Sequence, residues 1–187
     1  MDKININNLS GKCLAATPAT EGVFAKSLVY ICSHNSDGAF GVVINKPYKG
    51  LSFADLSFNL PFGNCSDNKR QVYNGGPLER DKGFILHDDS YEDVLGFPIS
   101  DGIRVSSSPE ILQAITTGKG PENFLIILGY AGWISGQLEN EISQNLWMVT
   151  PASRELVFNT QPEDKWALAL SSLGINSSNL SLPLGHS

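Results

Sequence analysis

The histidines are the first residues of this 187-residue chain that could do chemistry. His34 and Cys32 are two positions apart in a strand-like stretch, so their side chains should point to the same face. A zinc site needs three or four such ligands, and the chain has only two further histidines, His87 and His186. His87 shares a strand face with Asp89, which is a weak match to a base with an orienting carboxylate. We expect no metal site and no cofactor, and we assign no catalytic residue.

Two glycine-rich segments are the next candidates. The turn Asn74-Gly75-Gly76-Pro77 could hold an anion with its backbone N–H groups, although a purely structural turn is the commoner use. The segment from Gly129 to Gly136 lacks the spacing of a dinucleotide-binding fingerprint and the lysine of a phosphate loop. Glu139 and Glu141 follow it and would repel a phosphate. Neither segment therefore identifies a reaction.

Tyr130 and Trp133 lie within the second glycine-rich segment. They could form a stacking platform for a ligand, but aromatic side chains close a core more often, so we favour the core interpretation.

A buried strand and a helix must position these groups. The stretch from Phe124 to Leu128 is entirely apolar, which predicts a strand covered on both faces. Gly129, Gly132 and Gly136 predict a turn after it. The helix that follows should face inward through Leu138, Ile142 and Leu146.

The rest of the chain alternates short strands with turn signals and three further helices. Strands are expected near residues 12–16, 28–34, 40–45, 71–73, 83–87, 99–105 and 147–150, and helices near 52–60, 108–118 and 162–174. A polar loop is expected at 62–70, and residues 151–155 form a turn or short helix that leads into 156–158. The hairpin turn Asn35-Ser36-Asp37-Gly38 and the Asp101-Gly102 pair favour local antiparallel pairing. This pattern predicts one α/β (α+β) domain over residues 1–187, with a mixed, partly antiparallel sheet and with 1–10 and 176–187 peripheral.

Composition limits the classes of protein. Hydrophobic residues make up 41% and charged residues 17% of the chain, which is ordinary for a globular domain. No apolar run approaches the roughly 20 residues of a membrane span, and Met1 to Gly11 is too polar for a secretion signal, so we expect a cytoplasmic protein. Cys13, Cys32 and Cys65 are odd in number and widely spaced, so we expect reduced thiols.

The polar groups and glycine turns define one candidate binding site. In mixed sheets crevices form where strands end, and we predict that the turns 35–38, 74–77 and 129–136 converge there. The candidate binding residues are His34, Asn35, Asn45, Asn74, Gly75, Gly76, Tyr130, Trp133, Gln137 and Glu139.

The order of several motifs is similar to that of a known family. These motifs are His34-Asn35, Gly41 to Pro47, Asn74 to Pro77, Gly83 to His87, and Gly129 to Trp133 followed by Gly136 to Glu139. The sequence resembles the YqgE/AlgH family from about Gly11 to Gly185-His186. The resemblance implies a bacterial cytoplasmic domain of the three-layer αβα kind with no established activity. Some members are labelled transcriptional regulators.

Three classes of function stay open. A binding or interaction module with an indirect regulatory role, acting on a protein or a small molecule, fits best because no catalytic set is present. The alternative is a small-molecule enzyme, hydrolase-like, that uses His34, Asn35, Asn45 and Glu139 around the glycine turns. A DNA-binding regulator is disfavoured by the net charge of -6 and by the Ser108–Gly118 helix, which has no Lys or Arg.

Overall fold

A twisted sheet forms the centre of the protein in this computed structural model, which describes residues 6, 8–57, 70–92 and 94–180. Its strands are β1 (Cys13–Ala16), β2 (Leu28–Asn35), β3 (Gly38–Val43), β4 (Pro47–Ser52), β5 (Gln71–Asn74), β6 (Leu78–Asp88), β7 (Phe97–Ser100), β8 (Ile103–Ser106), β9 (Phe124–Ile134) and β10 (Trp147–Thr150). The helices are α1 (Phe53–Ser57), α2 (Pro109–Thr116), α3 (Gln137–Ser143) and α4 (Pro162–Ser171). Short 3-10 turns at Gly22–Phe24 and Ser177–Leu180 and a π-helical turn at Glu155–Asn159 complete the described elements.

The strand order is β10-β1-β2-β3-β9-β6-β8-β7, with β5 beside β9 and β4 beside β5. β5 and β9 are parallel, with Val72 opposite Ile126, and the other pairs are antiparallel. The mixed, partly antiparallel sheet predicted from the turn signals is confirmed, and the chain is a single α/β (α+β) domain.

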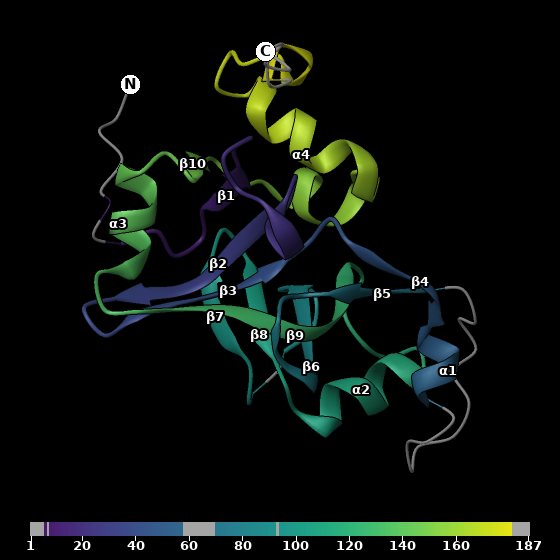
Figure 1. The fold of residues 1–187 in the computed structure, drawn as a ribbon. Helices are drawn as coiled ribbons and strands as arrows, with labels where there is room; N and C mark the ends of the chain where they lie inside the picture. Colours follow the sequence, from purple (N-terminus) through teal and green to yellow (C-terminus); the bar gives the residue numbers. More distant parts are fainter. Residues whose placement is uncertain (1–5, 7, 58–69, 93, 181–187) are drawn as a thin grey trace.

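Helices cover both faces of the sheet and make three layers (Figure 1). On β1, Cys13 and Ala15 join the core beneath α4, whereas Leu14 and Ala16 join the core beneath α3. α1 and α2 cover the α3 side of the sheet further along, around β5, β6 and β9. Because successive strand residues point to opposite faces, two covered faces require apolar residues without alternation, as β1 and β9 have.

Side chains cap the starts of α1 and α2. The backbone N–H of Ser52 donates to Asp55 Oδ2 at 2.8 Å and the Asp55 N–H donates back to Ser52 Oγ at 3.4 Å, which is a capping box before α1. Ser108 Oγ accepts from the Ile111 N–H at 3.4 Å at the start of α2. The predicted end of the first helix at Leu60, the polar loop at 62–69, Cys65 and His186 lie outside the described residues.

The largest correction concerns the glycine-rich segment after Leu128. It is not a turn: β9 continues through it to Ile134. Gly129 has a φ of 74°, and a side chain there would lie 2.7 Å from the carbonyl oxygen of Gly76. Gly75 is equally tight, since a Cβ would lie 2.3 Å from the Gly129 carbonyl oxygen. The glycines therefore let two backbones touch within the sheet rather than reverse the chain.

One shorter segment also differs from expectation. No strand is expected between residues 45 and 52, yet Pro47 begins β4 there. Proline is tolerated because β4 pairs on one side only and Pro47 is its first residue. Leu156 to Phe158 form part of the π-helical turn Glu155–Asn159.

Lys165 of α4 is a charged side chain buried in the core, with no exposed surface. Its Nζ donates to the carbonyl oxygens of Val157 at 2.7 Å and Ile44 at 3.1 Å, and lies 5.4 Å from the centre of the Tyr73 ring. Burial lowers the pKa of Lys165 from 10.5 to about 8.

No helix in the described residues is long and apolar enough to cross a membrane.

Candidate functional site

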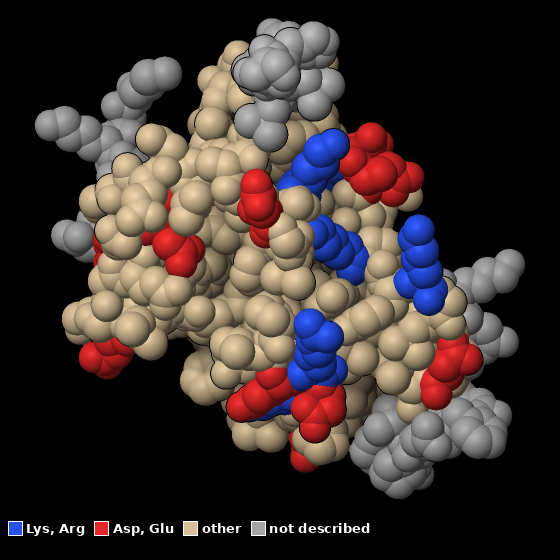
Figure 2. Space-filling model, in the orientation of Figure 1, with Lys and Arg blue, Asp and Glu red and all other residues tan. Residues whose placement is uncertain are grey.

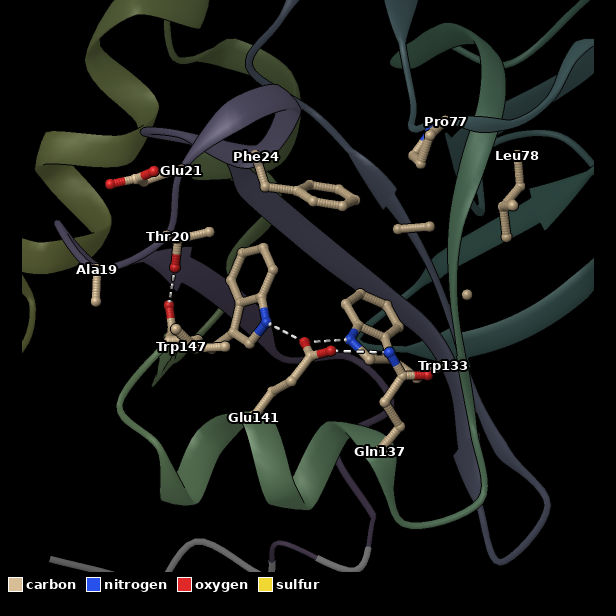
Figure 3. Close-up of a pocket in the computed structure, with 13 residues that line it drawn as sticks. Ala19, Thr20, Glu21, Phe24, Pro77, Leu78, Trp133, Gln137, Glu141 and Trp147 are labelled. Atoms are coloured by element: carbon tan, nitrogen blue, oxygen red, sulfur yellow. Dashed lines mark hydrogen bonds between the residues drawn. The ribbon is translucent and has the colours of Figure 1, made fainter.

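A pocket of about 340 Å³ opens between β9, α3, β10 and the segment that follows β1 (Figure 3). Its walls include Phe24, Pro77, Trp133, Gln137, Glu141 and Trp147. A volume of this size lies at the lower end of the range for small-molecule sites, roughly 300–1,000 Å³. We take this pocket as the candidate site.

The start of α3 positions the polar wall of the pocket. Gly136, with a φ of 74°, turns the chain from β9 into the helix. Leu138 is buried against the sheet, and Ile142 packs beside it. Gln137 and Glu141 are four residues apart and therefore point from the same side of the helix into the pocket.

The aromatic wall comes from strands that are distant in the sheet. Trp133 lies on β9 and Trp147 on β10, and β3, β2 and β1 run between them. Four spacings of about 4.8 Å would separate these strands by about 19 Å in a flat sheet. The ring centres nevertheless lie 6.1 Å apart, because both indoles reach across the α3 face of a twisted sheet.

Three side-chain N–H groups hold the carboxylate of Glu141. The indole Nε1 atoms of Trp133 and Trp147 each donate to Glu141 Oε2 at 2.8 Å, and Gln137 Nε2 donates to Oε1 at 2.8 Å. Gln137 Oε1 in turn accepts from the backbone N–H of Ile134 at 3.1 Å. All three donors are neutral, so they fix the carboxylate without cancelling its charge.

The rings around Glu141 form a corner rather than a stack. Trp133 and Trp147 meet at 78°, and Phe24 meets Trp147 at 74° with ring centres 5.6 Å apart. Trp133 is 7% exposed and Trp147 4% exposed, so each indole is both a core residue and a pocket wall. The core interpretation of Trp133 thus describes only part of its environment.

The structure brings two of the predicted site residues, Trp133 and Gln137, into this pocket. His34 and Glu139 lie elsewhere, bonded to each other: Nε2 of His34 and Oε1 of Glu139 are 3.1 Å apart. The His34 Nδ1 accepts from the Leu9 backbone N–H at 3.2 Å, which places the ring proton of a neutral His34 on Nε2. His34 is 4% exposed and uses both ring nitrogens, so it ties the segment before β1 to α3.

The predicted asparagines bond to nearby backbone. Asn35 Oδ1 accepts from the Asp37 N–H at 2.8 Å in the hairpin turn. Asn45 Oδ1 accepts from the Leu28 N–H at 2.7 Å, and its Nδ2 donates to the Lys26 carbonyl at 2.9 Å. Asn74 Oδ1 accepts from the Gly76 N–H at 3.2 Å. These contacts hold turns in place and leave the asparagines outside the pocket.

The three predicted turns do not meet in one depression. Gly75 and Gly76 lie against β9 at Gly129 and Tyr130, whereas Gly38 pairs with Ile134 at the other end of the same stretch. Tyr130 packs on the opposite face of the sheet, with ring centres 5.2 Å from Phe40 and 5.9 Å from Phe84.

Sequence reasoning missed Phe24, Glu141 and Trp147 as pocket residues. The four-residue spacing from Gln137 is a signal for Glu141, since it predicts a shared helix face. No local signal marks Phe24 or Trp147, because their place in the pocket depends on the twist of the sheet.

A family model described as AlgH-like matches residues 13–178. The chain belongs to the AlgH-like family. A UPF0301 protein of Nitrobacter hamburgensis is 41% identical over 189 residues, covering 95% of this chain and 87% of that relative. UPF0301 protein RP032 of Rickettsia prowazekii is 41% identical over 187 residues, covering 99% and 98%. The resemblance to the YqgE/AlgH family is confirmed.

Two solved structures share the fold. The solution structure of the AlgH protein from Pseudomonas aeruginosa has a TM-score of 0.78 and 37% identity, with both chains covered completely. The crystal structure of protein DIP2367 from Corynebacterium diphtheriae has a TM-score of 0.68 at 20% identity, covering 87% of this chain and 85% of that one. The second likeness extends to the fold alone.

The described residues contain no group of three or more His, Cys, Asp or Glu side chains that could hold a metal ion. Cys13 and Cys32 are buried free thiols. Burial raises the pKa of Cys13 from 9.0 to about 12, so that thiol stays protonated at neutral pH.

Proposed function

We propose that this member of the AlgH-like family is a cytoplasmic binding module whose ligand occupies the pocket between α3, β9 and β10. The observation that carries the proposal is Glu141, a carboxylate fixed by Trp133, Trp147 and Gln137 at the wall of a 340 Å³ cavity. Ligand sites combine apolar walls with a few fixed polar groups, and rigid side chains lose little entropy on binding.

A regulatory role, on this proposal, is indirect and passes through the ligand or a protein partner. The net charge of -6 opposes association with the phosphates of DNA. Figure 2 shows Lys and Arg side chains scattered among acidic and uncharged side chains, with no continuous basic surface on that face. α2 has an acidic residue in its first turn and no Lys or Arg, unlike a recognition helix.

The enzyme alternative is weakened because two of its four residues, His34 and Asn45, are engaged in structural hydrogen bonds. His34 uses both ring nitrogens in structural hydrogen bonds, and both ends of the Asn45 amide are bonded to backbone. A general base must reach a substrate proton at hydrogen-bonding distance, and a buried ring with both nitrogens engaged does not offer that.

The indole N–H resonances of the three tryptophans test the binding site directly. A library of small fragments is titrated into ¹⁵N-labelled protein. We expect the Trp133 and Trp147 resonances to move together while Trp166, whose Nε1 donates to the Ala16 carbonyl at 2.9 Å outside this pocket, stays in place. Fragments that move only Trp166, or none of the three, would contradict the assignment.

A further inference from the structure

We propose that the pocket recognises an organic cation, in which a methylated ammonium group or a protonated amine is attached to a small apolar body. This ligand class belongs to the same pocket and therefore depends on the proposed function. The charge of the lining, the free acceptor capacity of Glu141, the arrangement of the rings and the size of the cavity all point to it.

The lining of the pocket is negatively charged. The 13 described residues that form it include two carboxylates, Glu21 and Glu141, and no Lys or Arg. Figure 3 shows the Glu21 side chain at the rim, directed away from the rings, and the Glu141 carboxylate between the two indoles. Glu141 therefore sets the sign of the field inside the pocket, and that field favours a positive ligand group.

Glu141 keeps acceptor capacity for a ligand. Each carboxylate oxygen can accept about two hydrogen bonds. Oε2 accepts two from Trp133 and Trp147, whereas Oε1 accepts one from Gln137. The remaining position on Oε1 suits an N–H of a protonated amine, and the whole carboxylate attracts a methylated ammonium that has no N–H to donate.

The aromatic rings suit the same kind of group. A cation is attracted to the face of an aromatic ring, most strongly to Trp, and gains when several rings surround it. Phe24, Trp133 and Trp147 meet at steep angles, so the corner can offer ring faces in more than one direction. Because both indoles are almost fully buried, they are held in place before a ligand arrives.

Positively charged side chains lie on the other side of Phe24 and Pro77. A second cavity of about 20 Å³ lies there, lined by Lys46 and Arg80 among others. Lys46 Nζ donates to the Val23 carbonyl oxygen at 2.6 Å. That cavity has room for about one water molecule. A ligand in the larger pocket thus meets negative charge at Glu141 and positive charge beyond Phe24, which directs its cationic end toward α3.

Three probes of nearly the same shape separate charge from size: choline, the neutral 3,3-dimethyl-1-butanol and the anionic 3,3-dimethylbutanoate. Each is titrated into the full chain while the indole resonances of Trp133, Trp147 and Trp166 are followed. We expect choline to shift Trp133 and Trp147 with an affinity at least about tenfold above that of the neutral alcohol, and the anion to bind least.

Two substitutions on α3 provide a matched pair. Glu141→Gln and Glu139→Gln each remove one negative charge from the same helix, but the structure places Glu139 outside the pocket, against His34. We expect Glu141→Gln to lower the affinity for choline about tenfold more than the affinity for the neutral alcohol, whose binding reports on the shape of the pocket. Glu139→Gln should change choline affinity by less than about twofold, because Glu139 lies outside the pocket and points from another side of α3.

The possible outcomes separate the two proposals. Equal affinity for choline and the neutral alcohol, tighter binding of the anion, or an equal loss in both variants overturns cation recognition and leaves the pocket standing. If none of the three probes moves the Trp133 and Trp147 resonances while the fragment library does, cation recognition alone fails. If neither the probes nor the library moves them, the binding function fails as well.

Discussion

Glu141 and Lys165 lie on opposite faces of the sheet and show two ways in which neutral groups can hold a charged side chain. Lys165 is fully buried, with two carbonyl oxygens and the Tyr73 ring around its ammonium group. Glu141 is half-buried at the wall of a cavity. The ammonium of Lys165 is enclosed by protein, so its charge can act only on the fold. The carboxylate of Glu141 is fixed but accessible, and that combination suits recognition.

Replacing Lys165 or Glu141 with alanine should give the largest difference between the two side chains, in the free energy of unfolding. Lys165→Ala leaves a cavity and two buried carbonyls without their donor, so the free energy of unfolding should fall by about 3–5 kcal/mol. Glu141→Ala should cost about 1–2 kcal/mol, because water in the pocket can replace part of the lost hydrogen bonding. Urea denaturation followed by far-ultraviolet circular dichroism measures both. A loss for Glu141→Ala as large as that for Lys165→Ala would contradict the division.

The lowered pKa of Lys165 should contribute to the pH dependence of stability. Below pH 8 the lysine is charged in both states, and the cost of burying that charge is fully present. Between about pH 8 and 10.5 the unfolded chain binds more protons than the folded one, so this lysine makes stability rise with pH, by about 3 kcal/mol at most.

Other buried groups titrate in the same pH range. The contribution of Lys165 is therefore measured as a difference in unfolding free energy between the natural protein and a variant without this lysine. The raised pKa of Cys13, from 9.0 to about 12, makes stability fall above pH 9. The unfolding free energy of the natural protein minus that of Lys165→Met should rise with pH from 8 to 10.5. The effect of burial on Cys13 is common to both proteins, and only the smaller Coulombic coupling between Cys13 and Lys165 differs. A flat difference would show that Lys165 has an ordinary pKa in the folded protein.

Gln137→Ala should have the smallest effect on stability and a clear effect on the pocket. Gln137 is half-buried, so its loss should cost about 1 kcal/mol, against 2–5 kcal/mol, roughly, for the core substitution Ile126→Ala. Without the Nε2 donor the Glu141 carboxylate is less well fixed, so ligand-induced shifts of the Trp133 and Trp147 resonances should weaken. Ile126→Ala should leave those shifts unchanged in the folded fraction. If Gln137→Ala instead lowers stability strongly and leaves the shifts unchanged, Gln137 supports the fold and not ligand binding.

Local features of this fold can be predicted from the sequence alone. The capping box at Ser52 and Asp55, the cap at Ser108 and the hairpin turn after Asn35 each rely on groups within a few residues of one another. The inward face of α3 through Leu138 follows from helical spacing in the same way. Because these interactions are local, residue type and spacing determine them.

Tertiary structure decided the site. The glycines after Leu128 are equally compatible with a turn and with a strand whose neighbour approaches closely, and only the contact with Gly75 and Gly76 selects the strand. Residue type predicts a binding role for His34, but its partners Leu9 and Glu139 come from distant parts of the chain and engage both ring nitrogens. Trp133 and Trp147 meet across three intervening strands because the sheet twists, and twist accumulates over a whole sheet rather than over any short segment.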